Sequence, residues 1–518
     1  MSFIRPLMRS RFAVRAADWL SRAAGHLSDW LSRQISSPHM ERLLKRASAV
    51  FLTQVAGGGI MFLHGILLAR WLRPEAYGFY SFAVTLIIVL RILANFGLPL
   101  MLQRSVAVYG EAKNWAHLKG LLQYALKLSI GSGAATALVT AAAILLFMHP
   151  TGRAGGLILL ALPLLCLMPI SESAAGALRG LHQVSAGQAT EAIRSAIYLA
   201  LIVLTYLVLR HMTASTALIL RIIAEAAGAA LIIMWLRRHL PDDLKTAAAA
   251  FDVKTWRQGQ LSFMAIEAMY LIYLQTDILV LGVMRPMAEV GVYRMASNLT
   301  LILSFAAMIA TSTLGPLAAS AWSAGRKDEL ADVSRRMSRL AFLLTLAVYI
   351  ALLTAIPVFI SILGVEYSAL GLPLVILGFA QVLRALLSAS PSLVLMTNGE
   401  REGAWSVGAS AVSNLLLNLA LIPLLGMAGS AIATALSTIL QTGLYAWFAY
   451  RRTGISGAAI EDKRLIAWWH QARALTQRLM KILKEVLTQA VAYASKTLPK
   501  AARSLAKTAK SLTKTAKL

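Results

Sequence analysis

Apolar runs of about 20 residues recur along nearly the whole chain, and they constrain the fold more than any other feature. Hydrophobic residues make up 58% of the 518 residues and charged residues only 14%, whereas a soluble protein carries about 25% charged residues. Such runs predict membrane-spanning helices rather than a soluble core, so the chain is expected to be an all-α polytopic membrane protein. We delimit twelve spans, at residues 47–69, 78–101, 119–147, 154–177, 187–209, 214–236, 258–284, 290–314, 338–363, 368–390, 403–424 and 427–449.

One stretch occurs twice in related form. The first copy, RPEAYGFYSFA, begins at Arg73, and the second, RPMAEVGVYRMA, begins at Arg285. Their glycines, Gly78 and Gly291, are much farther apart than the roughly 20–50 residues of a solenoid repeat. The duplication therefore predicts two homologous halves. Paired repeats around a midplane site are common in secondary transporters.

Lys and Arg gather in every second loop between the expected spans. Arg179 is one of these cations, and residues 237–257 hold five more. The positive-inside bias predicts that both termini and the loop at 237–257 are cytoplasmic. We therefore divide the chain into a basic N-terminal segment at 1–46, an N-lobe at 47–236, a linker at 237–257, a C-lobe at 258–450 and a basic tail at 451–518.

Both ends of the chain are strongly basic. Residues 1–46 hold nine Lys and Arg against three acids, and residues 451–518 hold fifteen against three. Because this charge flanks membrane spans, it predicts amphipathic segments that bind anionic lipid, at about 1 kcal/mol per cation near the surface, and not a nucleic-acid partner. A mitochondrial transit peptide is the alternative for the first segment, and a solvated, partly disordered tail for the second.

The usual motifs of membrane-associated enzymes are missing from the sequence. It contains no GxxxxGK[ST] phosphate-binding loop and no HExxH metal motif. Its one cysteine, Cys166, excludes a disulfide within the chain and a cysteine zinc site. We therefore expect no catalytic residues, no metal and no cofactor other than a coupling proton or sodium ion.

Ionisable side chains inside apolar spans are costly, so each is a candidate for function. Arg91 and Arg384 lie deeper than the others and have no nearby acid on their own helix. We predict that they bind an anionic substrate, because guanidinium stays protonated when buried and holds anions bidentately. Arg194, Arg221 and Arg294 are added to this set, although structural ion pairing or a position near a helix end explains them as well.

The seventh span carries a second candidate group. Glu267, Tyr270, Tyr273 and Asp277 fall within about 120° of one helical face, taking 100° per residue. A carboxylate here can hold a proton or sodium ion in one state and release it in another. A hydrogen-bonded structural acid is the alternative. Glu225, on the sixth span, completes the predicted ion-coupling set.

Three stretches resemble bacterial oligosaccharide flippases, the polysaccharide biosynthesis branch of the multidrug/oligosaccharidyl-lipid/polysaccharide exporter superfamily. They are LLARWLRPEAYGFYSFAVTLIIVLRILANFGLP, TDILVLGVMRPMAEVGVYRMASNL and NLLLNLALIPLLGMAGSAIATALSTIL, and together they cover both halves. The chain departs from the peptidoglycan-precursor members of the family, which have two further helices that the amphipathic residues 462–494 do not supply. The basic tail also has no counterpart in the common pattern.

The resemblance implies two six-helix lobes around a central cavity and transport by alternating access. The implied substrate is a polyprenyl-diphosphate-linked oligosaccharide, moved across the bacterial inner membrane for exopolysaccharide or lipopolysaccharide O-antigen synthesis. It also implies partners among the polysaccharide polymerase and export machinery. With a glycan as substrate, we predict that Tyr198, Tyr270 and Tyr273 stack on sugar rings, with aromatic packing as their alternative role.

Two other functions stay open. A drug/cation antiporter of the same superfamily would carry acids in its cavity and would have little need for cations. A membrane polysaccharide polymerase or ligase would have a large outer loop with Arg or His, and this sequence has none. Arginines at least match the acids inside the spans, which favours an anionic substrate and hence the flippase.

Overall fold

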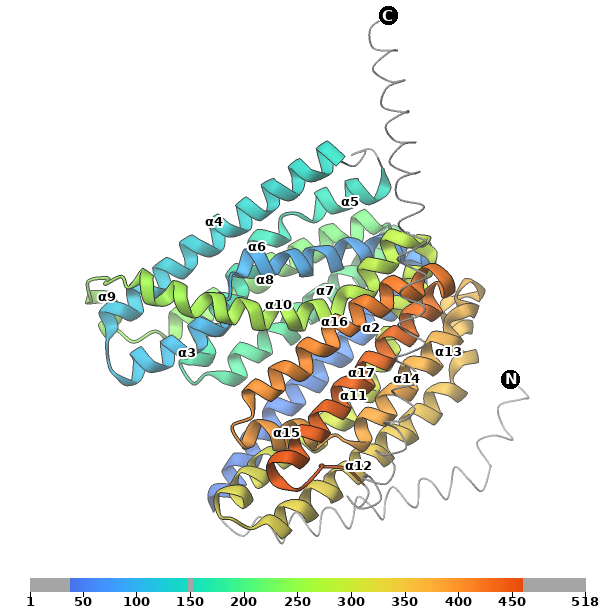
Figure 1. The fold of residues 1–518 in the computed structure, drawn as a ribbon. Coiled ribbons are helices and arrows are strands. Elements are labelled where there is room, and N and C mark those ends of the chain that lie inside the picture. Colours follow the sequence, from blue (N-terminus) through green and yellow to red (C-terminus); the bar gives the residue numbers. More distant parts are fainter. Residues whose placement is uncertain (1–37, 148–151, 460–518) are drawn as a thin grey trace, which may run out of the picture. The chain divides into compact units, whose positions relative to one another are not determined.

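The computed structural model describes residues 38–147 and 152–459, and every regular element among them is a helix (Figure 1). The chain forms two compact units, residues 1–52 and 53–518, and the second holds every helix after α2. The basic segments at 1–46 and 451–518 lie almost entirely outside the described residues. The helices are α2 (Pro38–Asn95), α3 (Leu98–Glu111), α4 (Trp115–Phe147), α5 (Arg153–Ala161), α6 (Leu164–Gly180), α7 (Val184–Leu209), α8 (Ala214–His239), α9 (Asp243–Thr246), α10 (Val253–Met284), α11 (Met287–Ser323), α12 (Lys327–Thr354), α13 (Ile356–Leu363), the 3-10 helix η1 (Val365–Leu370), α14 (Gly371–Leu386), α15 (Ser390–Met396), α16 (Glu400–Leu425) and α17 (Met427–Thr453).

Helix α2 is kinked at Arg73, where φ is 61° and ψ is 168°. Pro74 explains the kink, because proline lacks a backbone N–H and disfavours helical geometry in the residue before it. The two arms of α2 hold the first two expected spans. The second arm ends at Asn95, because Phe96 and Gly97 both adopt positive φ. The span expected at 78–101 is therefore wrong at its end, and a new helix begins at Leu98.

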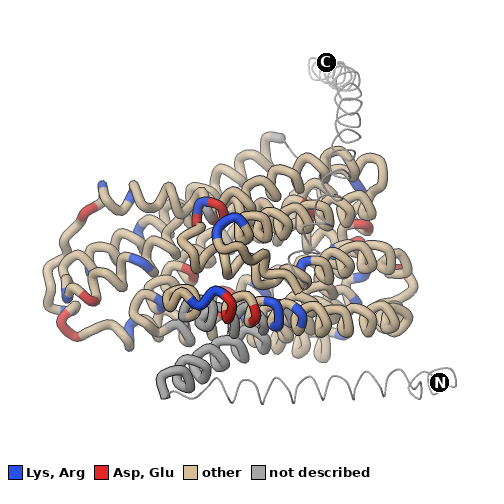
Figure 2. The backbone as a smooth tube through the Cα atoms, turned by 60° about the horizontal axis from the view of Figure 1, so that its bottom comes forward, with Lys and Arg blue, Asp and Glu red and all other residues tan. Residues whose placement is uncertain are grey.

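Nine helical stretches of the described residues are long and apolar enough to cross a membrane. One of them, Gly57–Asn95, contains two of the expected spans, whereas α11 and α17 are not among the nine. Figure 2 shows how sparsely charged residues are distributed along these helices. The all-α, multi-pass membrane fold is thus confirmed, while the number of twelve spans stays a prediction.

Helix α6 is the centre of the packing among the helices before the linker, where it contacts α3, α4, α7 and α8 (Figure 1). Small residues allow this close approach. At Gly176, a Cβ would lie 2.3 Å from the carbonyl oxygen of Pro99 on α3. Small residues at such contacts are typical of helix packing in membranes. Helix α6 therefore presents its side chains to several neighbours at once.

Beyond the linker, α16 and α17 form a closely packed pair, and α11, α12 and α14 pack together. Amides and hydroxyls join the pair: Asn414 donates to the Ser437 hydroxyl at 3.0 Å, and the Ser430 hydroxyl donates to Asn418 at 3.0 Å. Helix α10 lies along α16 and also contacts α3. It therefore belongs to both groups of helices.

The duplicated segments cross each other at their glycines. A Cβ on Gly78 would lie 1.8 Å from the carbonyl oxygen of Met287, and a Cβ on Gly291 would lie 2.0 Å from that of Pro74. Each of these carbonyls lies four residues before the opposite glycine, so the contact is reciprocal. The two copies therefore meet about a local two-fold relation, and only glycine fits at either position.

The linker at 237–257 is held against the beginning of α4. Lys119 donates to the carbonyl oxygens of Lys245 and Ala247, both at 2.9 Å. Within the linker, the Lys245 ammonium donates a hydrogen bond to the Asp242 carboxylate in an ion pair of 2.6 Å. This hydrogen bond lowers the pKa of the Asp242 carboxyl below its usual range. The linker is thus an ordered connection between the two groups of helices.

Candidate functional site

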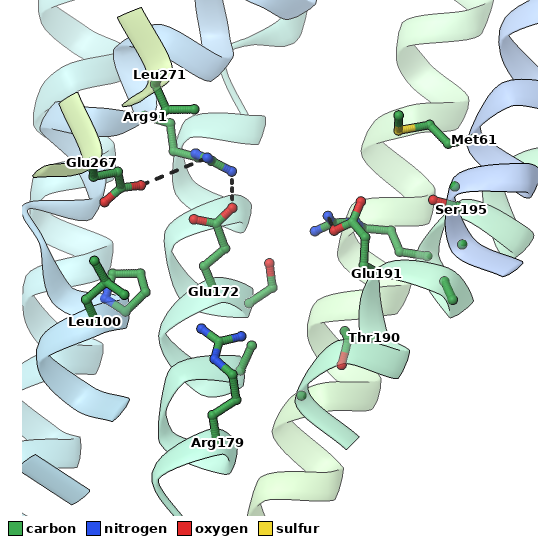
Figure 3. Close-up of a pocket in the computed structure, with 18 of the residues that line it drawn as sticks. Met61, Arg91, Leu100, Glu172, Arg179, Thr190, Glu191, Ser195, Glu267 and Leu271 are labelled. Carbon is green, nitrogen blue, oxygen red and sulfur yellow. Dashed lines mark hydrogen bonds and ion pairs between the residues drawn. The ribbon is translucent and has the colours of Figure 1, made fainter. Parts of the chain in front are cut away.

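A cavity of about 620 Å³ lies among α2, α3, α6, α7 and α10 (Figure 3). Its volume falls within the roughly 300–1,000 Å³ typical of ligand sites. Most of its lining is apolar. Its ionisable side chains are three arginines and three glutamates: Arg91, Arg179, Arg194, Glu172, Glu191 and Glu267. Such groups inside an apolar membrane fold must be paired or must face a wet space.

The first cluster in the cavity joins three helices around Arg91 of α2. Its guanidinium forms an ion pair with Glu172 of α6 and lies 4.0 Å from the carboxylate of Glu267 on α10. Asn95, one turn further along α2, donates to Glu172 at 2.6 Å and to Glu267 at 2.9 Å. Figure 3 shows Arg91 between the two acids. The cluster therefore links helices of the first half to α10.

A second cluster surrounds Arg194 of α7. Its guanidinium pairs with Glu191 on the same helix and with Glu225 of α8 at 2.7 Å. The hydroxyl of Ser171 on α6 donates to the same Glu225 carboxylate at 3.0 Å. Glu225 is only 1% exposed. Removing Arg194 would leave a buried, uncompensated carboxylate, a change that typically costs about 3–5 kcal/mol.

A smaller chamber of about 30 Å³ adjoins the main cavity, and Arg194 lines both. The guanidinium carbon of Arg221 lies 5.7 Å from the centre of the Tyr198 ring, within the range of a cation–π contact. The Tyr198 hydroxyl lies 2.9 Å from that of Tyr80 and donates to a backbone carbonyl. The ring of His64 packs edge-on against Tyr198, with centroids 5.2 Å apart.

Asp277 lies in the second half of the chain and lines neither the main cavity nor the smaller chamber. Its carboxylate is 7% exposed and accepts a hydrogen bond from the Tyr293 hydroxyl at 2.8 Å. Tyr293 also lies 3.3 Å from the hydroxyl of Thr434 on α17. Among the described residues, Asp277 has no Lys or Arg within ion-pair distance. It is a buried acid surrounded by hydroxyl and amide groups.

The structure brings seven of the eleven predicted site residues together and leaves four elsewhere. Those lining one or both spaces are Arg91, Arg194, Arg221, Tyr198, Tyr270, Glu225 and Glu267. Arg384 is exposed, the Tyr273 hydroxyl lies 3.0 Å from that of Thr438, and Arg294 and Asp277 also lie outside both linings. No group of three or more His, Cys, Asp or Glu in the described part of the chain could hold a metal ion.

Three charged residues that line the cavity are missing from the predicted set of site residues. Glu172 is an acid inside an apolar span, so the criterion that selected Glu267 applies to it equally. Glu191 shares a helical face with Arg194. Arg179 was counted only as a loop cation, and no sequence signal distinguishes it from one. The structure adds all three to the cavity.

Comparisons with known proteins give a family and a fold. A family model described as polysaccharide biosynthesis protein matches residues 43–322, more than half of the chain. A curated relative, the probable low-salt glycan biosynthesis flippase Agl15 of Haloferax volcanii, is 25% identical over 177 residues. That alignment covers 34% of this chain and 38% of the relative, so it spans less than half of the relative's length.

Several solved structures resemble this fold, among them the following two. An inward-facing multidrug resistance MATE family transporter of the MOP superfamily matches with a TM-score of 0.64 at 15% identity, over 78% of this chain and 95% of that one. The lipid II flippase MurJ, in an inward closed conformation, matches with a TM-score of 0.60 at 15% identity, over 77% and 86%. At these identities the likeness establishes the fold alone.

Proposed function

This chain belongs to the polysaccharide biosynthesis protein family, as its sequence resemblance predicted, and we propose that it is a flippase for a polyprenyl-diphosphate-linked oligosaccharide. It moves this lipid from the inner to the outer leaflet by alternating access, as a transporter rather than an enzyme. One observation carries the proposal: guanidinium groups from α2, α6 and α7 line a single cavity among apolar helices. A diphosphate that enters a membrane needs such compensation, because it must lose its water.

The proposed binding step is an exchange of ion-pair partners. In this structure, Arg91 pairs with Glu172, and Arg194 pairs with Glu191 and Glu225. A diphosphate supplies several oxygens that guanidinium can hold bidentately, and it would replace the carboxylates as their partner. Each charge-assisted hydrogen bond contributes about 1.5–3 kcal/mol. The carboxylates keep the arginines compensated when no substrate is bound.

Sugar rings are proposed to stack on tyrosines. Tyr270 suits this role best, because it lines the cavity and is 55% exposed. Tyr198 is buried beneath Arg221 and already hydrogen-bonded, and Tyr273 bonds to Thr438. For Tyr198 and Tyr273, sugar stacking stays a prediction that requires these contacts to open.

We propose that a proton or sodium ion drives the conformational change. Asp277 supports this idea most directly, because its buried carboxylate forms no ion pair with a described Lys or Arg and accepts hydrogen bonds from the Tyr293 hydroxyl and the backbone N–H of Ile278. Glu267 and Glu225 were predicted for the same role, but each pairs with an arginine. A coupling ion at either carboxylate would therefore compete with an arginine and would be linked to substrate binding.

The orientation and surroundings of the protein are proposed from its charges. The linker at 237–257 and both termini are placed on the cytoplasmic side of the bacterial inner membrane. The boundaries of the N-lobe at 47–236 and the C-lobe at 258–450 follow from this topology. The basic ends would bind anionic lipids, and the released substrate would pass to the polysaccharide polymerase and export machinery.

One observation favours a second candidate, the drug/cation antiporter. Glu172, Glu191 and Glu267 balance the three arginines of the cavity in number, so its lining is not simply cationic. A cationic drug would bind these acids in place of the arginines. The two functions therefore differ in which partner of each ion pair the substrate replaces.

Complementation of a null strain tests the flippase. Wild-type protein and an Arg153→Ala control, altered at a side chain that is 79% exposed, should restore surface polysaccharide. Arg91→Ala should insert normally yet leave the lipid-linked glycan in the inner leaflet, and Arg91→Lys should restore only part of the transport because lysine lacks the guanidinium fork. Wild-type polysaccharide levels in Arg91→Ala would contradict the proposal. A null strain that loses only drug resistance would favour the antiporter.

A further inference from the structure

Arg179 differs from the other two arginines of the cavity in its partners. It lies in the last turn of α6 and lines the cavity. Arg91 and Arg194 are each paired with carboxylates, whereas Arg179 forms no ion pair with any described residue. Among the described residues, its one hydrogen bond runs from Nε to the amide oxygen of Gln103 on α3, at 3.0 Å. No described residue bonds to either terminal nitrogen of the guanidinium.

The surrounding helices hold the side chain in this place. A Cβ on Gly187 of α7 would lie 2.9 Å from Cγ of Arg179 and 3.1 Å from the carbonyl oxygen of Ala175. The absence of a side chain at Gly187 therefore gives the stem of Arg179 its room, while Gln103 fixes its Nε. Figure 3 shows the guanidinium turned toward Glu172 on the same helix. Arg179 is thus a positioned cation rather than a mobile surface charge.

From these contacts we propose that Arg179 is the loading residue, the first group to bind the substrate's diphosphate. This inference rests on the proposed flippase function. Arg91 and Arg194 can bind an anion only after a carboxylate is displaced, but Arg179 can do so at once. On the proposed topology, Arg179 lies at the cytoplasmic end of α6, at the depth where headgroups of the inner leaflet arrive.

The geometry of α6 also defines the next step. Glu172 lies seven residues before Arg179 on the same helix, about 10 Å deeper at 1.5 Å per residue. Glu172 is the carboxylate that occupies Arg91. A diphosphate bound at Arg179 therefore approaches the Arg91 cluster from the side of Glu172, and it needs to displace only this acid to reach the second guanidinium.

Binding of farnesyl diphosphate to the purified full-length protein, in phosphatidylcholine nanodiscs, tests the inference. Arg179→Ala should weaken binding about 10- to 100-fold, the value of one charge-assisted hydrogen bond, and Arg179→Lys should weaken it less. Arg153→Ala should bind as wild type, and binding of farnesol, which lacks the diphosphate, should be the same in all variants. Thermal unfolding of each variant verifies that the fold is intact.

A second substitution separates binding from a structural role. Glu172→Gln removes one acid from Arg91, so adding it to Arg179→Ala should restore part of the lost affinity by offering another guanidinium. A merely structural effect of Arg179→Ala would not be rescued in this way. Phosphatidylglycerol added to the nanodiscs should compete weakly. If it competes as well as farnesyl diphosphate, the residue binds ordinary lipid headgroups and the inference is wrong.

The outcomes distinguish the two proposals. If wild-type protein binds farnesyl diphosphate and Arg179→Ala binds it equally well, Arg179 is not the loading residue, although the flippase proposal stands. If wild-type protein binds no farnesyl diphosphate, both proposals fail. Loss of affinity in Arg179→Ala, with partial rescue by Glu172→Gln, supports both.

Discussion

The two copies of the duplicated segment place the same residue type in opposite electrostatic surroundings. Tyr80 and Tyr293 each lie two residues after the glycine of their own copy. The Tyr80 hydroxyl lies 2.9 Å from that of Tyr198, whose ring lies beneath the guanidinium of Arg221. The Tyr293 hydroxyl donates to the buried carboxylate of Asp277 at 2.8 Å. The two copies thus share the tyrosine, with a guanidinium near it in one half and a carboxylate in the other.

A related contrast is found between the helices of the two halves. The helices before the linker hold ion pairs beside the cavity. Buried amides and hydroxyls join α16 to α17, and the one ion pair between these two helices among the described residues, Arg452–Glu402, lies near the last turn of α17. An ion-paired network responds to a charged ligand that exchanges partners, while an unpaired buried acid responds to a small cation. We propose that this difference reflects a division of labour, with diphosphate recognition by arginines of the first half and ion coupling at Asp277 in the second.

The largest effect is expected at the crossing that joins the two copies. Gly78→Ala and Gly291→Ala would each place a Cβ within 2.0 Å of a backbone carbonyl oxygen, so the helices must separate. We expect destabilisation at or above the top of the range of about 1–3 kcal/mol for overpacking, seen as a lower unfolding temperature and lost transport. Gly131→Ala is the matched control, because its Cβ would meet no atom within 4 Å. Equal stability of all three variants would show that the crossing is not tightly packed.

The division of labour is tested next by neutralising two acids of α10, Asp277 away from the cavity and Glu267 in its lining. Asp277→Asn should abolish the dependence of transport on an ion gradient but spare substrate binding, because Asp277 lies outside the cavity and forms no ion pair with a described arginine. Glu267→Gln should instead alter affinity for the diphosphate, because Glu267 lies beside Arg91. Transport in proteoliposomes with and without proton or sodium gradients measures both. Unchanged gradient dependence in Asp277→Asn would contradict the assignment of coupling to the second half.

A smaller effect is expected from removing the matched hydroxyls. Tyr293→Phe deprives a buried carboxylate of its hydrogen bond, which should cost about 1.5–3 kcal/mol in the free energy of unfolding. Tyr80→Phe removes a bond between two neutral hydroxyls and should cost about 0.5–1.5 kcal/mol. Thermal unfolding in the same detergent compares the two. If the two costs are equal, the electrostatic contrast between the copies has no energetic consequence.

The sequence predicted the fold class and the duplication because both depend on local pattern and length. Apolar runs indicate membrane helices wherever they occur, and Pro74 marks the kink in α2 from its own chemistry. The break after Asn95 was missed, because the apolar run continues through it, although Gly97 and Pro99 are residues that often mark a helix boundary. Helix ends inside one apolar run are set by packing, which the pattern does not contain.

The candidate site was only partly predictable for a related reason. The cost of burying charge selected Arg91, Arg194 and Glu267, which line the cavity. The same cost does not reveal which acid faces which arginine, since the partners come from different helices. Arg384 satisfied the criterion equally well, but the structure leaves it exposed and outside the cavity. The depth of a charged residue within a span therefore shows that its burial is costly, but it does not show whether the residue faces the cavity.

Arg384→Ala gives the smallest expected effect. It tests whether an arginine of the second half also binds the diphosphate. Arg384 lies in the second half and forms no ion pair with any described residue, so its removal leaves no buried charge uncompensated. If the first half alone recognises the diphosphate, this variant should transport at nearly the wild-type rate, within the roughly 0–1 kcal/mol of an exposed charge. Arg91→Ala, measured in the same null strain, provides the contrast. A loss in Arg384→Ala as large as that in Arg91→Ala would show that the substrate contacts a cation in each half, and recognition could then not be assigned to the first half alone.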